Sequence, residues 1–195
     1  RFRTFAEVSG LPGVVTLKGI GNAGRNNPND LGMLGMHGTY TANMAVAETD
    51  LLISVGARFD DRVTGKIDSF APRARIIHID IDPTSISKNV KVDVPIVSDC
   101  KKALTAMNTW FNNEQQISVA DEKHKHQAWF EQIRQWNDRH PLAYRDEGDD
   151  VIKPQYVVEM LDELTGGEAI IATEVGQHQM WAAQFYRYNT PRRFL

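Results

Sequence analysis

The sequence predicts an α/β fold: an open, mostly parallel sheet flanked by helices. Short apolar, largely β-branched runs occur at residues 14–17, 51–55, 76–81 and 169–175, with a weaker one at 94–97. They are apolar at consecutive positions rather than at alternate ones, which is typical of strands covered on both faces. Helical patterns lie between the runs, and this alternation indicates an α/β sheet.

The helices expected between these strands span residues 39–48, 83–88 and 99–111. Thr39 is placed to cap the first of them, because its side-chain oxygen can accept a backbone N–H of the first turn. The third has apolar residues, including Leu104, at helical spacing.

The chain is expected to contain two domain segments, residues 1–111 and 151–195, joined by a linker with one helix over 112–150. The linker begins with the polar stretch 112–121, which has no clear periodicity.

Two helices are expected in the second half of the chain. The first covers residues 122–139 and has Trp129 and Trp136 on one face. The second starts at Pro154, a residue suited to the first helical position, and ends at the glycine pair 166–167.

Composition excludes several classes of protein. The chain has 195 residues, 42% hydrophobic and 24% charged, as in an ordinary globular protein of one large domain or slightly more. A net charge of −3 gives no basic surface for nucleic acid, and no apolar run reaches the roughly 20 residues of a membrane span. The single cysteine, Cys100, excludes a disulfide framework and fits a reducing, cytoplasmic compartment. Because the chain begins at Arg1 and ends at Leu195, we expect both ends to be cut from a longer protein.

Residues 19–24 read GIGNAG and match the GxGxxG pattern of dinucleotide-binding proteins. That pattern requires a helix to begin at the last glycine, so that its N-terminus meets a pyrophosphate. Residues 25–30 have turn composition instead. We therefore expect a tight loop at a strand end rather than an NAD fingerprint.

Two glycine loops, at residues 32–38 and 56–62, are arranged to receive a long ligand that carries phosphate. The backbone N–H groups of the first could face an anion or a carbonyl-rich ring. His37 in this loop could act as a base, but no residue is available to orient it, so a ligand contact is favoured. In the second loop Arg58 could bind phosphate, although alternating aspartates and arginines are also typical of a surface ion-pair cluster.

Acidic residues follow the strand at 76–81, where Asp80 and Asp82 could accept hydrogen bonds from ribose or ribityl hydroxyls. A metal site there is disfavoured, because a hard cation needs more oxygen ligands than this stretch offers. Residues 174–181 repeat the order of strand, glycine and helix start, which could present donors to a diphosphate.

Four strings of this sequence resemble one family: LGMLGMHGT at 31–39, GARFDDRVTGK at 56–66, HIDIDP at 78–83 and VGQHQMWAAQ at 175–184. Together they resemble an internal segment of the catalytic (large) subunit of acetohydroxyacid synthase, also called acetolactate synthase. The alternative is a related enzyme such as glyoxylate carboligase or pyruvate oxidase. The string from Arg58 to Lys66 and the QHQMW string favour the synthase.

The resemblance implies a thiamine diphosphate-dependent transferase of branched-chain amino acid biosynthesis. Such an enzyme joins pyruvate to a second pyruvate or to 2-ketobutyrate, with loss of CO2. Residues 1–111 would be a Rossmann-like central domain that binds FAD, entered after its first strand. Residues 151–195 would begin the domain that binds thiamine diphosphate and Mg²⁺. The flavin has no redox role in the net reaction of this family.

The resemblance also assigns residues. Expected FAD contacts are Thr16, Leu17, Lys18, Gly19, Leu34, Gly35, Met36, His37, Gly56, Ala57, Arg58, Phe59, Asp60, Asp80, Ile81, Asp99 and Cys100. Thiamine diphosphate would be approached by Val175, Gly176, Gln177 and His178, and the substrate and inhibitor channel would be lined by Asp61, Arg62, Met180 and Trp181.

The family's cofactor-activating glutamate and its Mg²⁺ ligands do not correspond to any residue of this chain. We therefore expect no catalytic and no metal-binding residue here, and no activity from the chain alone. The expected partners are small 2-keto acids, further copies of the chain and a regulatory small subunit, with no nucleic acid and no membrane.

Overall fold

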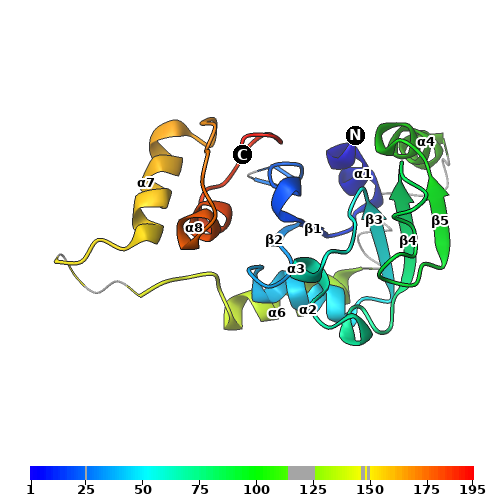
Figure 1. Cartoon of the computed structure of the whole chain (residues 1–195), viewed down its shortest axis with the longest axis horizontal. Helices are drawn as coiled ribbons and strands as arrows, with labels where there is room; N and C mark the ends of the chain where they lie inside the picture. Colours follow the sequence, from blue (N-terminus) through cyan, green and yellow to red (C-terminus); the bar gives the residue numbers. More distant parts are fainter. Residues whose placement is uncertain (25, 114–125, 146–147, 149) are drawn as a thin grey trace.

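The expected α/β architecture is present, with parallel strands flanked by helices (Figure 1). The computed structural model describes residues 1–24, 26–113, 126–145, 148 and 150–195. In this part of the chain the strands form two parallel sheets rather than one, with the orders β1-β2 and β3-β4-β5. None of the described helices is long and apolar enough to cross a membrane.

The larger sheet consists of β3 (Leu51–Val55), β4 (Arg75–Asp80) and β5 (Val94–Val97). Leu51 is opposite Arg75 in the parallel register, and Ile77 is opposite Val94. Because all three strands run in the same direction, their carboxyl ends meet at one edge of the sheet.

The middle strand of this sheet is the most buried. Ile79 is 0% exposed, as expected for an aliphatic side chain of a strand covered on both faces. On the other face Ile76 packs with Phe59 and Val90 in a hydrophobic cluster. The outer strand β5 carries Pro95, which has no N–H to offer at a sheet edge.

The smaller sheet pairs β1 (Gly13–Val15) with β2 (Asp30–Met33) in parallel. The sequence pattern predicted β1 but missed β2, which has only two large apolar residues among its four positions. Met33 and Val15 nevertheless belong to the larger hydrophobic cluster of the chain, with Ile20 and residues from the C-terminal segment.

The described helices agree with most of the sequence expectations. Thr39 caps its helix by accepting the Ala42 N–H at 3.0 Å. Pro154 opens a helix that ends at Gly166 in the left-handed conformation. The helices are α1 (Phe2–Ser9), α2 (Tyr40–Glu48), α3 (Asp61–Thr64), α4 (Cys100–Asn113), α6 (Gln127–Arg139), α7 (Pro154–Thr165) and α8 (Gln177–Phe185), with 3-10 turns at Leu17–Gly19 and Ile67–Ser69.

Two predicted elements are wrong. Residues 83–88 form turns instead of a helix. Asp82 accepts the Thr84 N–H as an N-cap would, but Ser87 has a φ of +57°, a left-handed conformation that interrupts a right-handed helix. Residues 169–175 make a single bridge, Ile171 to Phe194, instead of a strand. Residues 122–125 of the helix predicted at 122–139 lie outside the described residues.

The C-terminal segment packs against the smaller sheet. Ala182 and Ala183 of α8 lie in the cluster with Val15 and Met33. In Figure 1, α7 and α8 lie at one end of the molecule, with α8 nearer to β2. The loops of the smaller sheet are therefore held between the larger sheet and the C-terminal helices.

Candidate functional site

Three loops meet at the carboxyl edge of the larger sheet. They begin at Gly56 after β3, at Ile81 after β4 and at Ser98 after β5. The Gly56 N–H donates to the Ile79 carbonyl at 2.8 Å, and the Ser98 N–H donates to the Asp80 carbonyl at 2.9 Å. The predicted cofactor residues of these three strands are thus brought together.

Gly56 allows the first and third of these loops to approach closely. Its φ is +66°, a conformation that side chains with a Cβ rarely adopt. A Cβ at this position would lie 3.2 Å from the Cys100 sulfur. Cys100 in turn lies near the Ile79 carbonyl, with its sulfur 3.9 Å from that oxygen. Glycine is therefore favoured here by the backbone conformation, and a side chain would also require the Cys100 sulfur to shift.

Asp80 is the buried acid of the site, with 7% of its surface exposed. One carboxylate oxygen accepts the Asp82 N–H at 2.9 Å, and the other lies 4.0 Å from His78 Nε2. Asp82 itself is exposed, and hydrogen bonds from the Thr84 hydroxyl and then the Thr84 N–H lower its pKa. The two acids therefore differ: Asp82 is exposed and binds within its own turn, while Asp80 is buried at the end of β4 beside His78.

The second loop, residues 57–60, has unused backbone donors. No acceptor within the described chain is present for the N–H groups of Ala57, Arg58, Phe59 or Asp60. Phe59 has a φ of +55°, which is uncommon for a residue with a side chain. A run of consecutive unpaired N–H groups is the arrangement that binds anions and polar ligand atoms.

The arginines and aspartates of this loop also form surface contacts with each other, as the alternative of a surface ion-pair cluster predicted. Arg58 pairs with Asp60 at 3.1 Å, but both side chains are exposed, so the pair adds little stability. The Asp61 carboxylate accepts the Arg62 N–H at 2.9 Å, and Arg62 Nη1 lies 3.7 Å from the Met36 sulfur. Arg58 and Arg62 therefore remain available to a ligand at modest cost.

The first glycine loop is packed against this second loop. Its Met36 N–H donates to the Arg62 carbonyl at 2.8 Å, and a Cβ on Gly35 would lie 2.3 Å from that carbonyl oxygen. The Asn43 side chain binds both the N–H and the carbonyl of Gly35, at 2.8 and 3.0 Å. The two loops thus form one unit.

This packing changes the role expected of the first loop. Five of the six N–H groups of residues 34–39 are already bound within the protein, and only that of His37 has no acceptor in the described structure. The sequence suggested a loop whose backbone faces an anion. In the structure, the groups of this loop that remain available to a ligand are the exposed side chains of Met36 and His37 and the N–H of His37.

The loop after β1 contains Thr16, Leu17, Lys18 and Gly19. It is closed by the Gly19 N–H, which donates to the Thr16 carbonyl at 2.8 Å. No helix follows within residues 20–24 or 26–29, so the GxGxxG match is not a dinucleotide fingerprint, as predicted. Lys18 instead lies 5.9 Å from the centre of the Phe194 ring.

The predicted residues of the C-terminal segment lie at the start of α8. Gly176 precedes the helix, Gln177 and His178 open it, and all of Val175, Gln177 and His178 are exposed. Met180 and Trp181 follow, half-buried, one turn further on. Gln184 joins this helix to the first glycine loop by donating to the His37 carbonyl at 2.8 Å.

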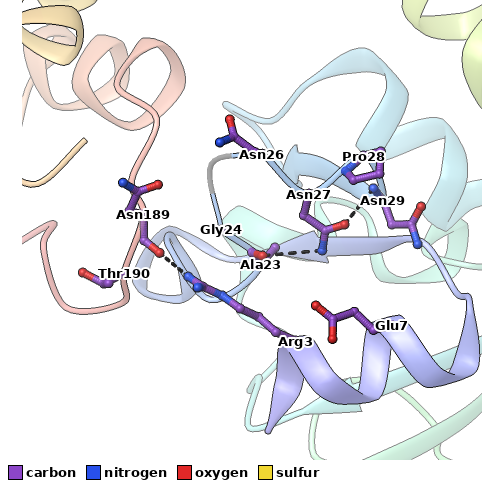
Figure 2. A pocket seen from close by; sticks show the side chains of 10 residues that line it. All are labelled: Arg3, Glu7, Ala23, Gly24, Asn26, Asn27, Pro28, Asn29, Asn189 and Thr190. Atoms are coloured by element: carbon purple, nitrogen blue, oxygen red, sulfur yellow. Dashed lines mark hydrogen bonds between the residues drawn. The ribbon is translucent and has the colours of Figure 1, made fainter. Parts of the chain in front are cut away.

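A polar pocket of about 550 Å³ lies elsewhere, between α1, the loop before β2 and the C-terminal segment (Figure 2). Its size suits a small molecule. However, Arg3 donates to the carbonyls of Gly21, Asn22 and Asn189, and so joins three segments of chain. None of the predicted cofactor residues lines it; the lining is Arg3, Glu7, Ala23, Gly24, Asn26, Asn27, Pro28, Asn29, Asn189 and Thr190.

Within the described residues, no group of three or more His, Cys, Asp or Glu side chains is placed to hold a metal ion. Cys100 is not an activated nucleophile, because burial first, and then the charges of Asp80 and Asp99, raise the pKa of its thiol.

The chain is similar to known proteins over nearly its whole length. Residues 1–107 match the central domain of thiamine pyrophosphate enzymes. The chain is 51% identical over 193 residues to acetolactate synthase 1, chloroplastic, of Oryza sativa subsp. japonica, covering 99% of this chain and 29% of that protein. It is 50% identical over 191 residues to acetolactate synthase 2, chloroplastic, of Zea mays, covering 98% and 29% respectively. The chain thus spans less than a third of the length of these relatives.

The raised pKa of Cys100 predicts its reactivity. Alkylation by iodoacetamide should have a pH midpoint above the roughly 8.5 of a free cysteine. Replacing Asp80 by Asn removes one negative charge next to the thiol, so the midpoint should fall, but burial should keep it above that of free cysteine. Asp68→Asn, at an exposed carboxylate that does not contribute to the shift, is the matched control. Mass spectrometry of the modified peptide measures the rates, and equal midpoints in the Asp80→Asn variant and the unchanged chain would contradict the assignment.

Proposed function

The chain belongs to the thiamine pyrophosphate enzyme family, and from that premise we propose that it is part of the catalytic subunit of an acetolactate synthase. Relatives named as acetolactate synthases, at about half identity over nearly the whole chain, support this choice. They disfavour a glyoxylate carboligase or pyruvate oxidase. The whole enzyme would condense pyruvate with pyruvate or 2-ketobutyrate, with loss of CO2, in a reducing compartment such as the cytoplasm.

The function proposed for residues 1–111 is to bind FAD at the carboxyl edge of the larger sheet. The observation that carries this proposal is the run of four N–H groups at residues 57–60 that have no acceptor in the described chain, on the loop that follows β3, next to the strand that ends with Asp80. Backbone donors suit the flavin diphosphate, and a buried carboxylate suits the hydroxyls of ribose or ribityl. Gly56 fits the same group, since a larger residue would crowd this edge.

The first glycine loop would contact the flavin differently. With its backbone N–H groups largely satisfied, Leu34, Met36 and His37 would act through side-chain packing and a single N–H. Thr16 to Gly19 lie at the end of the neighbouring small sheet and would add further contacts. This division would give one phosphate-binding loop and two loops that pack against the ligand.

The C-terminal segment would approach thiamine diphosphate. In the complete enzyme that cofactor, with Mg²⁺, supplies the chemistry of decarboxylation and carbon–carbon bond formation. The exposed start of α8, with Gln177 and His178, offers the positive end of a helix dipole to its diphosphate. Asp61, Arg62, Met180 and Trp181 would line the channel through which 2-keto acids enter. The Gln184 bond to the His37 carbonyl supports this arrangement by keeping α8 close to the flavin loops.

FAD binding can be tested by titration of FAD fluorescence with the purified chain. We expect quenching on binding and flavin colour that stays with the protein through gel filtration. Asp80→Asn should weaken the affinity about tenfold, since it replaces a charged acceptor by an amide. Asp68→Asn, an exposed acid away from the sheet edge, should leave the affinity unchanged. Colourless protein that takes up no added FAD would reject the proposal for this chain.

The chain alone should form no acetolactate from pyruvate, even with both cofactors and Mg²⁺ added. The reason is that no residue here corresponds to the cofactor-activating glutamate or the Mg²⁺ ligands of the family. A colorimetric assay for acetolactate, with a complete synthase as the positive control, measures this directly. Product above the level of a protein-free blank would show that the catalytic groups are present after all.

The chain should also associate with itself, as the synthase proposal implies for the complete enzyme. Large apolar side chains are exposed on α7 and beyond it, including Leu161 at 45%, Leu164 at 84% and Val175 at 91%. Light scattering should give a mass of at least two chains. The double variant Leu161→Lys and Leu164→Lys should shift the mass towards one chain, while Glu163→Lys, between the two, should not. A monomer in the unaltered chain would count against the proposal.

A further inference from the structure

His78 is the one ionisable side chain of β4 that the sheet buries completely, with 0% of its surface exposed. It lies on the same face of the strand as Asp80, and its Cα is paired with that of Ser54 on β3. A strand this apolar would be expected to carry an aliphatic residue at the position. A buried imidazole is costly unless its polar atoms are used, so its contacts indicate what it does.

The ring uses one nitrogen only. Nε2 lies 2.9 Å from the carbonyl oxygen of Ala57, whereas Nδ1 is buried and has no hydrogen-bond partner among the described residues. A carbonyl oxygen can only accept, so Nε2 carries the hydrogen. The only hydrogen bond of this buried ring to the described residues is therefore made to the loop that follows β3, where its unpaired N–H groups begin, and the Asp80 carboxylate lies farther away, at 4.0 Å from Nε2.

Packing holds the same loop from the same direction. The Phe59 ring meets the His78 ring edge to face, with centroids 5.0 Å apart. Phe59 is buried although its backbone is in the left-handed region, a conformation that persists only when its surroundings hold it. The Asn89 side chain adds a bond to the Phe59 carbonyl at 3.0 Å. The loop is thus held at the carbonyls of residues 57 and 59, and the N–H groups remain unused.

We propose that His78 is a positioning residue, whose Nε2–H fixes the Ala57 carbonyl and so holds residues 57–60 in the conformation that leaves their N–H groups free for a ligand. The proposal rests on the function proposed above only in naming that ligand as FAD. Asp80 completes the arrangement, because its carboxylate lies on the same strand face, two residues along. His78 itself touches no ligand; it acts through the loop.

Limited trypsin digestion tests the proposal without any cofactor. The Arg58–Phe59 bond is cleavable only when the loop opens, because Phe59 is buried. His78→Phe keeps an aromatic ring against Phe59 but removes the donor, and should speed this cleavage about tenfold, as the loss of one buried hydrogen bond gives. His78→Gln supplies an N–H at a similar reach and should restore most of the resistance.

Cleavage after Arg134 in α6 is the internal reference. A merely structural role would speed both cleavages equally, and that result, or no change after Arg58, would overturn the proposal. If His78→Phe does not fold, nitrogen NMR of the unaltered chain decides the question. The proposal requires a slowly exchanging Nε2–H in His78, and an Nδ1–H tautomer would overturn it.

FAD titration of the same variants then connects the loop to the ligand. His78→Phe should weaken FAD about tenfold, with His78→Gln near the unaltered chain. If neither the unaltered chain nor any variant binds FAD, the FAD-binding function proposed above is rejected, while the digestion result for His78 still stands. If cleavage after Arg58 changes but FAD affinity does not, the loop is held by His78 but does not bind the flavin, and the positioning role is overturned.

Discussion

The parallel pairing of β3 with β4 is the constraint on which the rest of the site depends. The pairing places Val55 beside Ile79, so that the next residue of each strand, Gly56 and Asp80, emerges at the same edge. The Gly56 N–H bond to the Ile79 carbonyl extends the ladder by one step and determines where the loop leaves the sheet. The buried histidine, the buried acid and the unpaired donors all take their places from that register.

The sheet edge alone would not define the long binding site that the proposed FAD requires. The first glycine loop reaches this edge through the Arg62 carbonyl, which accepts the Met36 N–H, although it belongs to a different sheet. Gln184 then joins the C-terminal helix to the same loop. Hydrogen bonds therefore connect the loop after β3, the first glycine loop and α8 in that order. In the proposal, FAD would lie against the first two of these segments and thiamine diphosphate against the third.

Much of this could be predicted from sequence, and the failures have physical causes. Consecutive apolar residues correctly predicted the strands at 51–55 and 94–97. The burial on both faces that the pattern suggested is found in β4, whereas Leu51, Val94 and Val97 of the outer strands are exposed. The segment 169–175 has the same pattern but forms only one bridge, since a strand also needs partners, which composition does not report. The helix predicted at residues 83–88 is absent for a local reason: Ser87 has a left-handed φ of +57°, which a right-handed helix cannot contain, and the sequence pattern does not report that conformation.

The site shows a further limit of prediction from sequence. A glycine can be needed for different tertiary contacts, and the sequence does not distinguish them. Gly35 is needed because a Cβ there would strike the Arg62 carbonyl, and all but one of the N–H groups of its loop are bound within the protein. Gly56 is needed for close approach to Cys100, and the loop that follows it keeps its donors free. Both loops suggested phosphate binding when only their residues were considered. The difference lies in the tertiary contacts of Asn43, Arg62 and His78, so whether a glycine loop keeps its N–H groups free depends on what holds the loop rather than on its glycines.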